Sequence, residues 1–196
     1  MKSVLISIQP KWCGLIADGK KTVEVRKTAP KLKPPFKCYI YCTMPKTKDP
    51  HQVLEVHGAD GKIRKANGKV IGEFVCDDVL EFTHDPFGHH EYFISDDEIE
   101  ASCLNAEDLW CYGKGKTLYG LHISNRVVYA EPKELCQFRC ECKVFDKDSL
   151  MCCGCEYYYF ESNESIGFYD ECSCDGLKHI TRPPQSWCYV EEQEGK

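Results

Sequence analysis

The sequence lacks a long hydrophobic run. Its first apolar stretch, Val4 to Ile8, is much shorter than the core of a signal peptide or a membrane span, and no later stretch reaches spanning length. Internal repeats and low-complexity tracts are also missing. We therefore expect a cytoplasmic protein that does not enter a membrane. A length of 196 residues favours one domain with an insertion over two ordinary domains.

An excess of positive charge is also missing, because the formal net charge is −6. This argues against general affinity for polyanions. The charge is uneven, however: residues 1–70 hold 15 Lys and Arg against 5 Asp and Glu, and the remainder holds 10 against 26. A basic end of this kind favours a short, oriented contact with phosphate over binding to a long duplex. The alternative is that the two parts attract each other within the fold.

Cysteine, by contrast, is abundant, with 15 residues. In a reducing compartment, metal binding and burial are more common uses of cysteine than disulfides. Cys152 and Cys155 form a C-x-x-C pair around Gly154, and Cys172 with Cys174 would complete a four-thiolate set. We therefore expect a structural zinc ion, with free thiols as the alternative. Four nearby cysteines are alternate ligands: Cys136, Cys140, Cys142 and Cys153.

A second candidate metal site is a histidine-containing loop. His84, His89 and His90 lie close to Asp85 and Glu91 in the sequence "FTHDPFGHHEYF". Their spacing follows neither a helix nor a strand, which favours a solvated loop over a metal site.

The first 26 residues predict a strand, a helix and a second strand. Pro10 suits a first helical position, and Gly19 suits a left-handed residue that ends the helix. From Thr22 the pattern alternates, so that Val23 and Val25 face the core and Thr22, Glu24 and Arg26 share the other face. Lys21 lies at the junction.

The rest of the chain reads mainly as short strands. "FKCYIYCT" predicts a half-buried strand with Tyr39 and Tyr41 facing away from the core. Asp60-Gly61 and Asn67-Gly68 predict hairpin turns, Gly72 a bulge, and Asn105 the start of a short helix. The ending "PPQSWCYVEE" predicts a last strand that returns to the body. The fold class is therefore α+β, mainly β: a partly closed β-barrel with short crossover helices and a cysteine-rich insertion.

The stretch "GKKTVEVR" carries the most specific motif. Gly19, Lys21, Glu24 and Arg26 resemble the G-x-K-x-x-E-x-R motif of ASCH domains, which belong to the PUA-like superfamily. The opening "SIQPKWCGLIADG", the strand "LYGLHIS" and the ending "PPQSWCYV" are similar to ASCH-like proteins of bacteria and phages. The resemblance covers roughly residues 3–130 and 178–192. It divides the chain into a barrel (1–135), a cysteine-rich insertion that we expect to bind zinc (136–176), and a closing strand with a tail (177–196).

The resemblance implies a cleft beside the motif strand that takes RNA or nucleotide-like ligands. Arg26 would offer a planar fork, Lys21 a mobile ammonium, and Glu24 an acceptor for a base amine or a partner that orients Arg26. The alternative is a solvated Glu24–Arg26 ion pair, which would contribute about 0–1 kcal/mol. Bases need stacking surfaces and hydrogen-bonding groups, and for these we name Tyr39, Tyr41, Trp12, Gln185 and Ser186. Trp12 also shares an apolar helix stripe, which favours core packing.

One ASCH branch suggests an enzyme as the second hypothesis. That branch hydrolyses N4-acetylcytidine with a lysine, a threonine and a glutamate. Lys21 matches its lysine, but Glu24 stands where it has threonine, so Thr22 would have to supply the hydroxyl. Glu81 and Glu91 are candidates for the acid. The catalytic set would then include Lys21, Thr22 and Glu24.

A third hypothesis is a protein-interaction module that uses its zinc insertion and acidic surface. The principal prediction is a domain that binds single-stranded RNA or a modified nucleoside through Lys21, Glu24 and Arg26.

Overall fold

The computed structural model describes residues 2–45, 53–57, 60–84, 91–142, 145–146, 151–152 and 176–191. Its helices and strands, in chain order, are β1 (Lys2–Ile8), α1 (Pro10–Ala17), β2 (Val23–Arg26), β3 (Phe36–Cys42), β4 (Glu55–His57), β5 (Ile63–Lys65), β6 (Val70–His84), β7 (Tyr92–Phe93), α2 (Asp96–Ser102), α3 (Ala106–Gly113), β8 (Leu118–Lys133), the 3-10 turn η2 (Leu135–Gln137), β9 (Arg139–Glu141), β10 (Phe145–Asp146), β11 (Met151–Cys152), β12 (Leu177–His179) and β13 (Trp187–Glu191). The chain is mainly β with a few short helices, as the sequence predicts.

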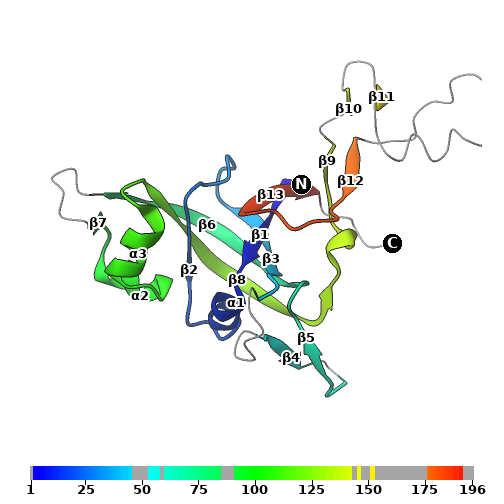
Figure 1. Ribbon diagram of the computed structural model, residues 1–196, viewed down its shortest axis with the longest axis horizontal. Coiled ribbons are helices and arrows are strands. Elements are labelled where there is room, and N and C mark those ends of the chain that lie inside the picture. Colours follow the sequence, from blue (N-terminus) through cyan, green and yellow to red (C-terminus); the bar gives the residue numbers. More distant parts are fainter. Residues whose placement is uncertain are drawn as a thin grey trace, which may run out of the picture.

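One large twisted sheet forms the body of the molecule (Figure 1). Its strand order is β12-β9-β13-β1-β3-β6-β8-β2, with β7 paired to the end of β6. The β1–β3 pair is parallel, and the other pairs are antiparallel. The prediction of a partly closed barrel is wrong, because the sheet stays open: β2 and β12 lie at its opposite ends, and each pairs with a single neighbour. The last strand, β13, does return to pair with β1.

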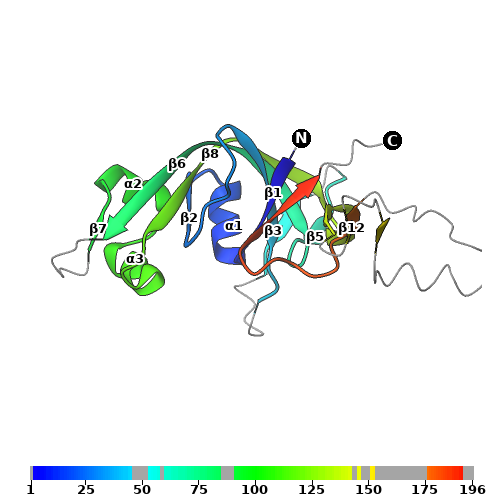
Figure 2. The ribbon, with the colours of Figure 1, turned by 90° about the horizontal axis from the view of Figure 1, so that it is seen from above.

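The strand–helix–strand unit at the start forms as predicted. Pro10 is the first residue of α1, and Gly19 adopts φ +78° just after the helix. A side chain at Gly19 would also meet the guanidinium of Arg126, 2.7 Å from the added Cβ. In Figures 1 and 2, α1 lies between β2 and β1, so the chain leaves one strand, covers a sheet face and enters the edge strand β2.

The predicted turns and the bulge also form. The β4–β5 hairpin turns at Gly61, and Gly68 precedes β6; both glycines have positive φ. The register of β6 shifts next to Gly72 against both β3 and β8. A Cβ at Gly72 would lie 2.2 Å from the carbonyl oxygen of Val127, so this bulge requires glycine.

Both faces of β3 are buried, which corrects the prediction of a half-buried strand. Tyr39 is 2% exposed and Tyr41 5% exposed, in a cluster with Phe138, Ile180 and Val190. The rings of Tyr39 and Phe138 meet edge to face with centroids 4.9 Å apart. The face that alternation predicts to be exposed is therefore covered by residues far along the chain.

The helices α2 and α3 pack near the C-terminal end of β6 and the N-terminal end of β8 (Figure 2). Each begins with a capping box, at Ser95 for α2 and at the predicted Asn105 for α3. Buried Val23 and Val25 of β2 pack in the same cluster as Leu109 and Leu118. None of the helices in the described ranges is long and apolar enough to cross a bilayer.

Candidate functional site

A pocket of about 650 Å³ opens beside β2. The motif strand contributes one part of its lining, and β1, the start of α1, the segment after β3, α3 and the segment before β13 contribute the rest. The lining residues are Ser7, Gln9, Pro10, Trp12, Lys21, Glu24, Val25, Arg26, Thr43, Met44, Pro45, Leu104, Asp108, Tyr112, Pro184 and Gln185. The site thus joins segments from the two ends and the middle of the chain.

Lys21, Glu24 and Arg26 form a buried ionic cluster in this lining. Nη2 of Arg26 lies 2.9 Å from Oε1 of Glu24, and Nζ of Lys21 lies 3.5 Å from Oε2 of the same carboxylate. The three residues are only 2%, 5% and 7% exposed in chain order. The alternative of a solvated ion pair is therefore wrong, because all three side chains are shielded from water.

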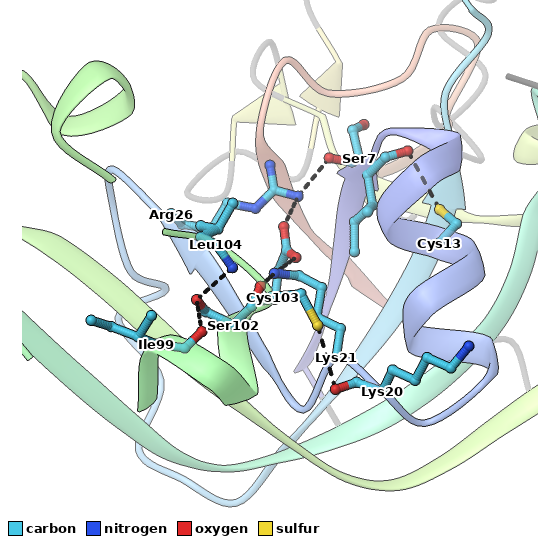
Figure 3. Close-up of polar contacts among 11 residues, drawn as sticks. Ser7, Cys13, Lys20, Lys21, Arg26, Ile99, Ser102, Cys103 and Leu104 are labelled. Carbon is cyan, nitrogen blue, oxygen red and sulfur yellow. Dashed lines mark hydrogen bonds and ion pairs between the residues drawn. The ribbon is translucent and has the colours of Figure 1, made fainter. Parts of the chain in front are cut away.

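Lys21 also holds the end of a helix. Its Nζ donates to the carbonyl oxygen of Ser102, the last residue of α2, at 2.5 Å (Figure 3). A cation is favourable there, because helix C-termini carry unpaired carbonyls and a partial negative charge. Burial nevertheless lowers the pKa of Lys21 from its ordinary value, and nearby Glu24 opposes that shift.

Arg26 links the ionic cluster to β1. Its Nη2 donates to the carbonyl oxygen of Ser7 at 2.6 Å. The same nitrogen therefore contacts both Ser7 and the carboxylate of Glu24 (Figure 3). Nε of Arg26 is buried and has no hydrogen-bond partner among the described residues. Ser7 in turn donates from Oγ to Pro184 and from its backbone N–H to Ser186. The C-terminal segment is thereby attached next to the arginine.

Two aromatic residues come to the pocket from opposite sides of β2, since α1 and α3 flank that strand in both ribbon views (Figures 1 and 2). Trp12 packs partly against the main core, and the ammonium groups of Lys11 and Lys21 lie 4.4 Å and 5.0 Å from its ring centroid. Tyr112 is 36% exposed, and Nζ of Lys27 lies 4.7 Å from its ring centroid. Trp12 therefore packs against the core, as its helix stripe predicts, and also lines the pocket, while its stacking role stays a prediction.

The other sequence-predicted site residues divide into two groups. Gln185 lines the pocket, and Ser186 contributes its carbonyl to Ser7 beside it. Tyr39 and Tyr41 lie in the second core, which corrects their proposed stacking role. Thr22 is outside the lining, and its backbone N–H donates to Ala101. Glu81 and Glu91 are exposed and outside the lining.

Sequence reasoning missed the contribution of α3. Asp108 and Tyr112 are four residues apart and therefore share one face of α3, and Leu104 directly precedes the Asn105 cap of that helix. That pattern is visible in the sequence, but nothing local shows that the face meets β2. Thr43 was missed as well, although it supplies a hydroxyl-bearing side chain to the lining.

The cysteines in the described residues serve mainly as core residues. Cys13, Cys38, Cys42 and Cys76 are fully buried, and burial raises the pKa of Cys76 to about 12. Among the alternate zinc ligands, Cys136 is exposed, Cys140 is half-buried and Cys142 is buried.

The described part of the chain contains no group of three or more His, Cys, Asp or Glu residues arranged for a metal ion. Cys153, Cys155, Cys172, Cys174, His89 and His90 lie outside the described residues, as does the side chain of Cys152. The zinc-binding insertion stays a prediction.

Comparison with known proteins identifies the family. The model of the ASCH domain matches residues 6–132. Among solved structures, ASCH from Zymomonas mobilis is 18% identical, covers 68% of this chain and 73% of its own, and has a TM-score of 0.47. A point mutant of that protein, also 18% identical, covers 69% of this chain and 77% of its own with a TM-score of 0.40. No curated protein matches.

Proposed function

Because the chain belongs to the ASCH domain family, we propose that its pocket binds a nucleoside unit, either a free modified nucleoside or an unpaired residue of single-stranded RNA. ASCH domains are PUA-like and generally bind RNA. The observation that carries the proposal is the buried cluster of Lys21, Glu24 and Arg26 in the lining of a pocket with aromatic walls.

The energetics of this cluster favour a functional role. Removing three charges from water is costly, and apolar residues of similar volume often give equal or greater stability. The motif segment, with Lys21 just before β2 and with Glu24 and Arg26 on it, retains two cations and a carboxylate at positions that are 2–7% exposed. Buried titratable groups in a cleft are frequent at functional sites, and the lowered pKa of Lys21 fits that pattern.

The size and chemistry of the pocket suit one base and its sugar. A volume of about 650 Å³ lies within the usual range for small-molecule sites. Trp12 and Tyr112 offer ring faces, and stacking on such rings contributes about 1–3 kcal/mol per base. Glu24, Arg26 and Gln185 bring both acceptors and donors to the lining, which matches the mixed edge of a nucleobase.

The test is calorimetric titration of the full chain with the ribonucleosides, N4-acetylcytidine and short single-stranded RNAs. We expect at least one of them to bind. Gln185→Ala should weaken that binding by about 1 kcal/mol without changing the fold, since Gln185 is exposed in the free protein. Gln137→Ala, on η2 and outside the lining, is the matched control. Failure of every compound to bind would refute the proposal.

A second candidate is hydrolysis of an acylated nucleoside such as N4-acetylcytidine. It is favoured by Lys21, whose lowered pKa increases the neutral, basic form of the amine. Because Thr22 is outside the lining and Thr43 is within it, Thr43 is the better source of a nucleophilic hydroxyl. Acetate release that is lost in Lys21→Met and Thr43→Ala but kept in Thr22→Ala would support this candidate. Binding without acetate release would exclude it.

A further inference from the structure

The pocket has two aromatic walls, and they differ in exposure. Trp12 packs against the main core and has two ammonium groups near its ring, at 4.4 Å and 5.0 Å. Tyr112 lies on α3, is 36% exposed, and has the single ammonium of Lys27 near its ring, at 4.7 Å. Tyr112 is therefore the more accessible stacking surface for a planar ligand.

Tyr112 lies close to the end of the motif strand. The ammonium of Lys27, the residue after β2, is 4.7 Å from its ring centroid, and Tyr112 lines the pocket together with Glu24 and Arg26. Burial raises the pKa of Tyr112, so the phenol is neutral at physiological pH. The ring therefore shares the pocket with the ionic cluster and has Lys27 beside it.

The cations in and beside the pocket differ in how far they are already paired. Lys21 and Arg26 share Glu24 and also donate to backbone carbonyls, so their charges are largely compensated. Lys27 is not a lining residue; it is exposed, lies beside the lining residue Tyr112, and has no ion-pair partner among the described residues. A ligand's anionic group would therefore find its best partner at Lys27, next to Tyr112, and not in the ionic cluster.

We infer that Tyr112 and Lys27 together determine specificity, with Tyr112 stacking the base and Lys27 contacting a phosphate attached to the same nucleoside. The pocket then selects a nucleotide, or a nucleotide within a strand, over the free nucleoside. Asp108 lies one turn before Tyr112 in the lining, and its carboxylate disfavours a phosphate on that side. This inference rests on the proposed function, because it requires a base in the pocket.

The experiment compares each ribonucleoside with its 5′- and 3′-monophosphates and with trinucleotides, using calorimetry on the full chain at low salt. We expect a monophosphate of the preferred base to bind about three- to five-fold tighter than the nucleoside, as one exposed charge contact implies. Added salt should reduce this gain. Trinucleotides that bind tighter than either monophosphate would identify a strand as the source of the phosphate, whereas equal affinity would identify the mononucleotide.

Variants separate the two residues. Lys27→Ala should bring the ratio of monophosphate affinity to nucleoside affinity to about one. Tyr112→Ala should weaken both ligands about ten-fold, and Tyr112→Phe should retain most of the affinity. Lys178→Ala, on β12 at the far side of the molecule from α3 (Figures 1 and 2), is the control of equal charge.

Two results overturn the inference in distinguishable ways. If nucleosides bind as tightly as their monophosphates, or Lys27→Ala leaves the ratio unchanged, the inference fails while the proposed function stands. If no nucleoside, nucleotide or trinucleotide binds, both fail.

Discussion

Nη2 of Arg26 lies 2.9 Å from Oε1 of Glu24, and both side chains are more than nine-tenths buried. Lys21 approaches the other carboxylate oxygen, so one anion serves two cations. The contacts within the ionic cluster therefore also shape the pocket lining, because all three residues belong to it. The contribution of these ion pairs to the free energy of unfolding is therefore the first quantity to measure.

Glu24→Gln should lower the free energy of unfolding by about 3–5 kcal/mol, because it leaves two buried cations without their counter-charge. Urea denaturation measures this change. The matched control is Asp18→Asn, which breaks an exposed pair with Lys20 at 3.4 Å and should cost no more than about 1 kcal/mol. Similar losses in the two variants would contradict the burial of the ionic cluster.

Lys21 should make stability depend on alkaline pH. Its pKa in the folded state is lowered from 10.5, with burial as the main cause, so between the folded and unfolded pKa values the unfolded chain binds more protons. The unfolding free energy of the wild type, relative to Lys21→Met, should therefore rise as pH increases toward 10.5. Urea denaturation of both proteins across that range provides the difference. A difference that falls with pH would show that the folded state favours the ammonium.

Two glycines should respond to alanine with opposite signs. A Cβ at Gly72 would lie 2.2 Å from the backbone oxygen of Val127, so Gly72→Ala requires the β6–β8 pair to separate and should destabilise the fold. Gly14 lies within α1, and among the described residues an added Cβ would meet only Leu54, at 3.8 Å, so Gly14→Ala should raise the free energy of unfolding by about 0.5–1 kcal/mol. Thermal melting of both variants checks the pair, and stabilisation by Gly72→Ala would contradict the bulge.

We propose that the purified protein carries zinc, held by Cys152, Cys155, Cys172 and Cys174 or by their neighbours. Thiolate sites of this kind are tight enough to survive gentle purification. Elemental analysis should find about one equivalent of zinc or more, and Cys155→Ser should reduce it. Cys111→Ser, which removes an exposed thiol of α3, is the control. A wild-type protein without metal would contradict this proposal and would favour the alternative that these cysteines are free thiols.

Features with local causes could be predicted from the sequence. Pro10 begins α1 because its ring fixes φ, Gly19 follows the helix because glycine allows a positive φ, and Asn105 caps α3 because its side chain accepts from the Asp108 N–H. The bulge at Gly72 and the return of the last strand were also predicted correctly. The motif residues were found because their spacing matches a family pattern.

Burial could not be predicted, because it depends on residues distant in the chain. Alternation around Glu24 and Arg26 is the same for a solvated strand and for one covered by other elements. The carbonyl that receives Lys21 belongs to a residue 81 positions away. Tyr39 is covered by Phe138 for the same reason, so the face that looked exposed became a second core.

The central claim is that the pocket beside β2 holds a base, and the indole N–H signals of the three tryptophans test it most directly. Trp12 lines the pocket, and Trp187 donates its indole N–H to Thr28. Trp110 packs against the hydrophobic cluster that contains Leu109 and Leu118. In nitrogen–proton correlation spectra, titration with the preferred nucleoside or nucleotide should shift the Trp12 signal strongly and leave Trp187 unchanged. A ligand that binds without moving the Trp12 signal, or a panel of nucleosides and RNAs of which none binds, would contradict the account.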